Sequence, residues 1–215
     1  MSATTSASKP SRRGPSIELQ RQIDDAIAAR SQTSQAYDGA SFNDELCSQV
    51  ANDANRSSTS VDEPGIAPPG SQYEYLDHPA DILLHSWGNN FLSCLINLAL
   101  AMFGCITSLP SITIDRTQSE KSGRNIVSLG HDARSLVYSF LDEWLFNFHD
   151  SGFIPKQILI EKYDAANYAI TSWGDGEVLD VSRHPRGVEV KAITYNAMRV
   201  EESEGRWDIY VVVDI

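Results

Sequence analysis

The stretch FLSCLINLALAMF, residues 91–103, decides the fold of this chain. Its apolar side chains fall on nearly every face of a helix, and such a helix has to lie in the interior of a protein. Asn89 or Asn90 can cap its start, and Gly104 can close it. It is too short for a bilayer, which needs about 18 apolar residues or more. We therefore expect a central core helix and no insertion into a membrane.

A second helix is predicted over residues 132–148, DARSLVYSFLDEWLFNF. Its apolar side chains recur at steps of three and four residues, which is typical of a helix with one buried face. Asp132 is the expected N-cap. The other face carries Arg134, Ser139, Asp142 and Glu143, so we expect this face to meet water or a partner.

The remaining pattern after residue 70 is rich in strands. A hairpin is expected to join residues 111–115 and 124–130 around the polar insert RTQSEKSG. Further strands are predicted at residues 73–77, 81–87, 156–164, 167–175, 177–181, 187–196 and 207–215, separated by Gly, Pro and Asp turns. Two helices among about eight strands predict an α+β fold, an antiparallel β-sheet sandwich packed around two helices.

Residues 1–70 differ from the rest in composition. They hold 12 Ser and 4 Thr and few large apolar side chains, a mixture typical of disorder. A short helix is conceivable at residues 16–31, and the Pro/Gly linker DEPGIAPPGS sets the domain boundary near Gly70. We expect a disordered extension over 1–70 and one folded domain over 71–215. Residues 1–14 lack the apolar core of a secretory signal, while a transit peptide stays open.

The negative charge of the chain argues against direct binding of nucleic acid. The formal net charge is −12, of which −9 lies after residue 70, so the folded domain lacks the basic patch that binds nucleic acid. If RNA is involved, we expect a partner to hold it.

Cys47, Cys94 and Cys105 have no CxxC spacing, which indicates reduced thiols in a cytoplasmic or nuclear protein. No P-loop, GxGxxG or GxSxG motif is present.

The turn DHPAD, residues 77–81, gathers Asp77, His78 and Asp81. Hard divalent cations favour carboxylate oxygens, and imidazole is a common ligand, so these side chains can build a metal site. Three such residues within five positions are weak evidence, however, and a solvated or turn-capping role is the favoured local interpretation.

The C-terminus strengthens the metal interpretation. A buried-looking strand ends at Asp214 and Ile215, whereas chain ends usually fray. The Asp214 side chain and the Ile215 carboxylate would then be fixed beside each other. With Asp81 they make an oxygen-rich site suited to Ca²⁺ or Mg²⁺ rather than zinc. The alternative is that the strand simply ends with Asp214 exposed.

His184 is a further candidate, in the sequence HPRG of residues 184–187. Pro and Gly are common turn formers, so a simple turn is the favoured interpretation. The functional alternative places His184, Arg186 and Lys191 together on a binding surface.

Five segments resemble the archease family: YEYLDHPADILLHSWG, AMFG, FLDEWLF, HPRGVEVKAITYNAM and the terminal VVVDI. The resemblance spans residues 72–215, and residues 1–70 have no counterpart in it. Pro79 stands where the family usually has Thr, which removes a hydroxyl and a backbone N–H. The segment TQSEKSGRN is a second departure, interpreted as a surface elaboration of the hairpin.

The resemblance implies a non-catalytic accessory protein with an α+β sandwich fold. Such a protein would activate an RtcB-type RNA ligase in tRNA splicing by promoting ligase guanylylation and multiple turnover, and would meet RNA only through the ligase. It also implies a divalent cation, Ca²⁺ first and Mg²⁺ or Mn²⁺ as alternatives. The implied ligands are Asp81, Asp214 and the Ile215 carboxylate, with Asp77, His78, His184 and Lys191 as supporting or partner-binding candidates.

Two other functions stay open at this point. One is a metal-dependent phosphohydrolase that uses His78 with Asp77 and Asp81. The other is a chaperone-like modulator of a tRNA methyltransferase, which rests on analogy within the family.

Overall fold

The computed structural model describes residues 64–65, 67, 70–123 and 125–215. Most of residues 1–70 lie outside this described part of the chain. The prediction of disorder there, the short helix predicted at residues 16–31 and Cys47 are therefore not covered by the structure. In the described part of the chain the helices are α3 (Phe91–Ile106), the 3-10 turn η1 (Leu109–Ser111), α4 (Arg116–Ser122) and α5 (Ala133–Ser151). The strands are β1 (Tyr73–Leu76), β2 (Ile82–Gly88), β3 (Ile126–Leu129), β4 (Phe153–Asp164), β5 (Ala169–Val178), β6 (Ala192–Ile193), β7 (Arg199–Ser203) and β8 (Arg206–Asp214).

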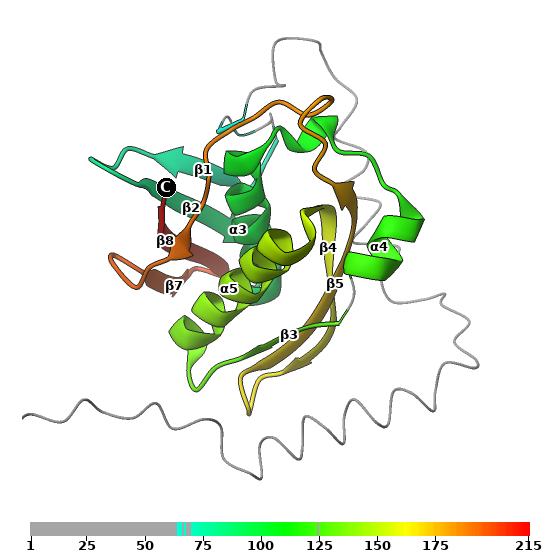
Figure 1. The fold of residues 1–215 in the computed structure, drawn as a ribbon. Helices are drawn as coiled ribbons and strands as arrows, with labels where there is room; N and C mark the ends of the chain where they lie inside the picture. The colour runs from blue at the N-terminus through cyan, green and yellow to red at the C-terminus, as the bar shows by residue number, and fades with distance from the viewer. Residues whose placement is uncertain (1–63, 66, 68–69, 124) are drawn as a thin grey trace, which may run out of the picture. The chain divides into compact units, whose positions relative to one another are not determined.

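Two antiparallel sheets enclose the long helices. The larger sheet has the order β1-β2-β8-β6, with β7 also paired to β8, and the smaller sheet has the order β3-β5-β4. Both α3 and α5 contact strands of each sheet, and Figure 1 shows them between the two layers. The predicted α+β sandwich around two helices is therefore confirmed, and α4 is a third helix that the sequence pattern did not indicate.

The start of α3 follows the prediction, and its end does not. Asn90 caps the helix by accepting the Ser93 N–H at 2.8 Å. Gly104, the predicted stop, lies inside the helix, which continues to Ile106. A side chain at Gly104 would place its Cβ 2.3 Å from the Tyr75 hydroxyl of β1. The glycine therefore serves close packing of β1 on the helix rather than termination.

Tertiary contacts terminate α3 in place of a glycine cap. The carbonyl of Gly104 accepts the Gly65 N–H at 2.8 Å. The carbonyls of Cys105 and Ile106 accept the N–H groups of Val188 and Gly187, each at 2.9 Å. The last carbonyls of a helix have no partner within the helix, so these bonds satisfy groups that would otherwise be buried without one.

The helix α5 forms as predicted and runs three residues further. Asp132 caps it by accepting the Ser135 N–H at 2.7 Å. Its inner face includes Phe140 and Trp144, both fully buried. Trp144 meets Phe103 of α3 edge to face with ring centroids 6.3 Å apart, which joins the two helices at the centre of the core.

The hairpin predicted around RTQSEKSG is wrong, because this segment forms α4. Asp115 caps α4 by accepting the N–H groups of Thr117 and Gln118. β3 pairs with β5 only over residues 169–172, which leaves the rest of this β5 edge without a strand.

Three groups of the α4 region supply the missing partners of β5. The carbonyl of Gly123 accepts the Gly174 N–H at 2.8 Å, the Ser119 hydroxyl accepts the Gly176 N–H at 3.0 Å, and the Gln118 side chain accepts the Val178 N–H. The segment therefore covers a sheet edge rather than decorating the surface.

The strand predicted over residues 187–196 is mostly absent. Only Ala192–Ile193 pairs with β8, as β6. The carbonyl of Val190 lies 3.2 Å from His149 Nε2, and the carbonyl of Met198 accepts a hydrogen bond from Arg134. Side chains of α5 thus contact backbone carbonyls within this segment, at Val190, and just after it, at Met198. β7 was not predicted, and the strand predicted at 177–181 ends at Val178 with β5.

The two described cysteines are interior. Burial raises the pKa of the Cys94 thiol to about 11 and that of Cys105 to about 12, so both stay protonated at neutral pH. No helix among the described residues has the length and apolar character needed to span a membrane.

Candidate functional site

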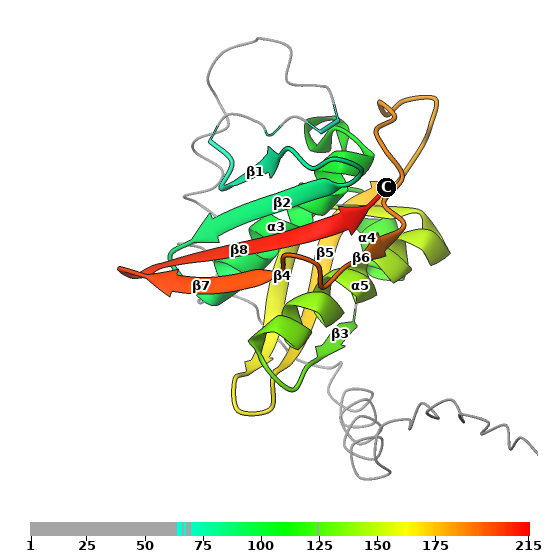
Figure 2. The same cartoon turned by 90° about the vertical axis from the view of Figure 1, so that its left-hand side faces the viewer.

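The strand register brings Asp81 and Asp214 to the same end of the larger sheet. Ile82 pairs with Val213, so continuing the register by one residue sets Asp81 opposite Asp214. Directly opposite residues of an antiparallel pair point to the same face, with Cβ atoms about 4.5–5.5 Å apart. Figure 2 shows the C-terminus beside the start of β2. The continued register therefore sets Asp81 and Asp214, which are far apart in the chain, opposite each other.

The end of β8 is held in place from both sides. The Lys191 N–H donates to the Asp214 carbonyl at 2.8 Å, and Ala192 pairs with Asp214 in the sheet. The Ile215 side chain packs against the core, so the terminal carboxylate follows directly after an anchored residue. Lys191 itself is exposed. Ile215 is thus held next to the Asp81–Asp214 pair.

The DHPAD turn orients Asp81 through His78. The Asp81 N–H donates to His78 Nδ1 at 3.3 Å, and the same nitrogen lies 3.6 Å from Asp81 Oδ2. A ring nitrogen that accepts a backbone N–H has no lone pair free for a metal ion. His78 therefore holds the turn through this nitrogen. Asp77 is exposed at the start of the turn. Pro79, which has no backbone N–H, is exposed as well.

The donor set fits a hard divalent cation. Within residues 70–123 and 125–215, no three His, Cys, Asp or Glu side chains gather closely enough to hold a metal ion. A cation at the Asp81–Asp214 pair would therefore need the Ile215 carboxylate as a third protein ligand. Like charges placed opposite each other in a sheet are destabilising, and a bound cation would relieve that repulsion. Oxygen ligands alone are what Ca²⁺ and Mg²⁺ prefer.

His184 lies apart from this site, inside the loop that follows β5. It is 4% exposed, and its Nδ1 accepts the Asp180 N–H at 3.0 Å. Its Nε2 lies 3.3 Å from Glu177 Oε1. The residues that follow it supply the N–H groups that terminate α3, and Pro185 accepts a hydrogen bond from Thr107. In this structure His184 is held inside its own loop, the residues that follow it contact the end of α3, and Arg186 is exposed.

Glu177 anchors the same loop. Burial by itself would raise the pKa of Glu177, but the Arg183 guanidinium and two hydrogen bonds from Thr113 outweigh it and lower the pKa to about 2. Arg183 contacts Oε2 at 2.5 Å, and the Thr113 hydroxyl donates to Oε1 at 2.8 Å. The carboxylate is thus charged and paired at neutral pH.

A second polar cluster, missed in the sequence, surrounds His85 on the outer face of β1, β2 and β8. His85 is 6% exposed, with Nδ1 2.8 Å from Glu74 Oε1 and Nε2 2.9 Å from Asp208 Oδ1. Each ring nitrogen of His85 therefore lies within hydrogen-bond distance of a carboxylate oxygen, one from β1 and one from β8. Burial opposes ionisation of Asp208, but hydrogen bonds from Arg206 and His85 leave its pKa lowered.

Aromatic rings and arginines cover this cluster. Tyr210 stacks on His85 with centroids 4.1 Å apart, and Arg199 lies 4.1 Å above the Tyr210 ring. Arg206 lies 5.2 Å from the Trp87 ring. Side chains alternate between the two faces of a strand, so in DILLHSW His85 and Trp87 lie on the same face as Asp81. This spacing is the sequence signal that could have revealed the cluster.

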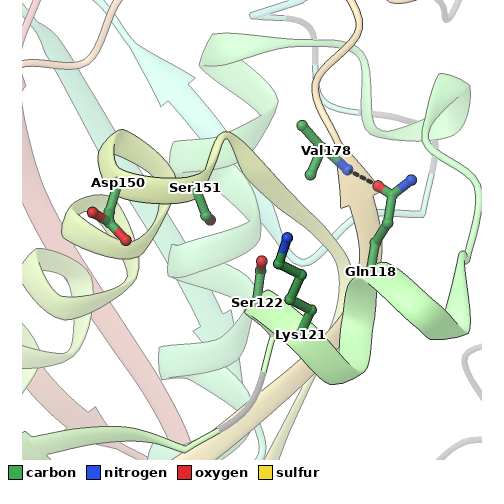
Figure 3. A pocket seen from close by; sticks show the side chains of 6 residues that line it. All are labelled: Gln118, Lys121, Ser122, Asp150, Ser151 and Val178. Carbon is green, nitrogen blue, oxygen red and sulfur yellow. Dashed lines mark hydrogen bonds between the residues drawn. The ribbon is translucent and has the colours of Figure 1, made fainter.

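A pocket of about 480 Å³ lies elsewhere, between α4 and the end of α5. Gln118, Lys121, Ser122, Asp150, Ser151 and Val178 line it (Figure 3). None of these residues belongs to the Asp81–Asp214 pair or to the His85 cluster. The pocket therefore adds nothing to the donor set described above.

Comparisons with known proteins decide the family. The family model described as the Archease protein family matches residues 73–215. The chain belongs to the archease family. The archease of Danio rerio is 43% identical over 146 residues, which are 67% of this chain and 85% of that protein. The archease-like protein of Dictyostelium discoideum is 41% identical over 66% of this chain and 93% of its own length.

A solved structure agrees with this archease assignment. The solution structure of Methanobacterium thermoautotrophicum protein 1598 is 26% identical, with a TM-score of 0.53, and the likeness covers 67% of this chain and 99% of that one. The matched region begins at β1 and ends at Ile215, so the archease domain contains the DHPAD turn, the HPRG turn and the C-terminal carboxylate.

Proposed function

We propose that this archease-family chain is a non-catalytic activator of an RtcB-type RNA ligase in tRNA splicing, and that it promotes ligase guanylylation and multiple turnover. The observation that supports this most is the register that sets Asp81 opposite Asp214 beside the chain terminus. An acidic domain of net charge −9 would meet RNA through the ligase rather than directly. The proposed compartment is the cytoplasm or the nucleus.

The proposed site holds one divalent cation, Ca²⁺ first and Mg²⁺ or Mn²⁺ as alternatives. Asp81, Asp214 and the Ile215 carboxylate would bind it. A bound cation neutralises charge that develops on phosphate groups. His78 keeps the backbone of Asp81 in place, and the Lys191 N–H does the same for Asp214. The acidic end of β8 would thus be presented to the nucleotide pocket of the ligase, while the ligase supplies the nucleophile.

Replacement of either aspartate tests this function. Asp81→Asn and Asp214→Asn each keep the side-chain shape and remove one charge, so we expect Ca²⁺ affinity and ligase turnover number to fall about tenfold or more. Titration calorimetry gives the first quantity and a multiple-turnover RNA joining assay gives the second. Glu202→Gln, an exposed change on β7, is the matched control. Undiminished multiple turnover with folded Asp81→Asn and Asp214→Asn would refute the proposal.

The two alternatives give different results in simple experiments. A phosphohydrolase needs a free base beside the metal, whereas His78 Nδ1 already accepts the Asp81 N–H. Hydrolysis of model phosphoesters by the isolated chain with Mg²⁺ or Mn²⁺ would support that alternative against ours. Copurification with a tRNA methyltransferase instead of a ligase would support the modulator alternative.

A further inference from the structure

The exposed side of α5 combines large aromatic side chains with carboxylates. Phe146 is 68% exposed, and Tyr195, from the segment beside the helix, is 55% exposed. Asp142, Glu143 and Asp150 are exposed on the same helix. We call Tyr138, Asp142, Glu143, Phe146, Asp150 and Tyr195 the α5 surface. Large exposed apolar side chains with charged neighbours are typical of protein–protein contact sites.

These residues share one side of the helix. At 100° per residue, the α5 positions of this set fall within about 140° of arc, starting from Tyr138. The opposite side of α5 carries Phe140 and Trp144, which are fully buried. The surface therefore faces away from the core along most of the helix.

The segment of residues 190–198 runs antiparallel beside α5 and widens this surface. Near the end of the helix, His149 Nε2 lies 3.2 Å from the Val190 carbonyl. Near its start, Arg134 donates to the Met198 carbonyl. Between these contacts, Tyr195 stacks on Tyr138 with centroids 4.5 Å apart and planes 1° from parallel. The stacked pair gives a rigid aromatic platform.

The α5 surface itself carries Asp142, Glu143 and Asp150 and no Arg or Lys, although Lys121 of α4 lines the pocket beside Asp150. Arg134 is the single Arg or Lys of α5, and its guanidinium is engaged with the Met198 carbonyl. Partial desolvation raises the pKa of Tyr195, and the nearby charges of Asp132 and Asp142 raise it further. A complementary partner therefore has to bring positive charge together with an apolar pocket for Phe146.

The α5 surface also adjoins the proposed metal site. Val190, next to His149 of α5, is followed by Lys191, whose N–H donates to the Asp214 carbonyl at 2.8 Å. β6 lies between β8 and α5 and contacts both. Figure 2 shows β6 between the end of β8 and α5, so a single partner can contact the α5 surface and the end of β8 at the same time.

We infer that the α5 surface docks a basic protein surface with an apolar pocket for Phe146, and, resting on the proposed function, that this surface belongs to the RtcB-type ligase. Phe146 and the Tyr138–Tyr195 pair supply the apolar contact, and the carboxylates orient the encounter. Such anchors usually carry most of the binding energy of an interface.

The test measures binding of the full chain to the purified RtcB-type ligase of the same organism, at low and high salt. We expect Phe146→Ala to weaken affinity about tenfold or more, as an interface anchor does. The double variant Asp142→Lys with Glu143→Lys should weaken binding and reduce its salt dependence, because screening acts on exposed charges. Matched controls are Ile114→Ala, 43% exposed, and Glu202→Lys with Glu204→Lys at the β7–β8 turn.

The outcomes separate this inference from the proposed function. If the wild-type chain binds the ligase and Phe146→Ala binds equally well at an unchanged melting temperature, the docking surface is wrong while the function stands. If the wild-type chain does not bind the ligase at all, both fall. Sedimentation adds a third outcome: a wild-type dimer that Phe146→Ala dissociates, with ligase binding unaltered, would assign the surface to self-association and overturn the inference.

Discussion

At the scale of single residues, hydrogen-bond partners separate His78, His85 and His184 by role. His78 and His184 each accept a backbone N–H through Nδ1 and hold a turn. His85 instead lies between two carboxylates in the sheet. His78 and His184 each precede a proline, whereas His85 lies between Leu84 and Ser86. These sequence neighbours do not reveal the roles, because the deciding partners of His85 and His184 come from other strands or from the far end of the same loop.

Glu177 gives a pH dependence of stability that can be measured. Its folded pKa is lowered to about 2 from an ordinary value of 4.5, so its contribution is present above about pH 4.5 and is lost as pH falls toward 2. Glu177→Gln should therefore destabilise the fold at pH 7 by at most about 3 kcal/mol, and the difference from wild type should shrink below pH 4. Urea unfolding from pH 3 to 7 measures this.

A matched control sharpens the Glu177 result. Glu189 is exposed, so Glu189→Gln should leave the unfolding free energy within about 0.5 kcal/mol of wild type across this range. If the Glu177→Gln difference stayed constant from pH 7 to pH 3, the loss would reflect packing alone, and the charge-based account would be wrong.

At the scale of elements, helices that carry their own signal were predicted and those that depend on neighbours were not. α3 and α5 have long apolar periodicities and side-chain caps within the segment. α4 has seven polar residues, too short for a helix to be stable alone. It forms because Gln118 and Ser119 bond the open edge of β5, a partner about 60 residues away in the chain.

The HPRG turn provides a test at this scale. A Cβ at Gly187 would lie 1.9 Å from the Cys105 carbonyl oxygen, so Gly187→Ala must push the loop away from the end of α3. We expect loss of the two hydrogen bonds from residues 187 and 188 and a destabilisation of roughly 2–3 kcal/mol. Chemical denaturation measures it, with Arg186→Ala, an exposed neighbour, as the control. A Gly187→Ala protein as stable as the control would contradict this account.

At the scale of the whole molecule, the proposed site exists only because the last strand returns to the start of β2. β8 is the central strand of its sheet and pairs with β2, β6 and β7. Its end is fixed by Lys191 and by the packing of Ile215. Chain ends are otherwise prone to disorder, so this anchoring is what would hold the Ile215 carboxylate in the proposed site.

Extension of the chain past Ile215 tests that dependence. A short Gly-Ser tail converts the terminal carboxylate into a neutral amide while Ile215 still packs, so we expect an unchanged melting temperature and a loss of Ca²⁺ affinity of about tenfold or more. Titration calorimetry of the full chain measures the affinity. The same tail added before Met1 is the control. Equal Ca²⁺ binding by both extended proteins would remove the Ile215 carboxylate from the site.

The sequence by itself determined the sandwich class, the two long helices with their N-caps, and the chemical type of the candidate ligands. Those features are local, because periodicity, capping residues and oxygen donors can be read from neighbouring positions. Tertiary structure alone decided α4, the short β6, the burial of His184, the His85 cluster and the facing of Asp81 by Asp214. Each of these depends on which distant backbone group accepts or donates a hydrogen bond, and strand register, which sets those partners, is a property of the assembled sheet.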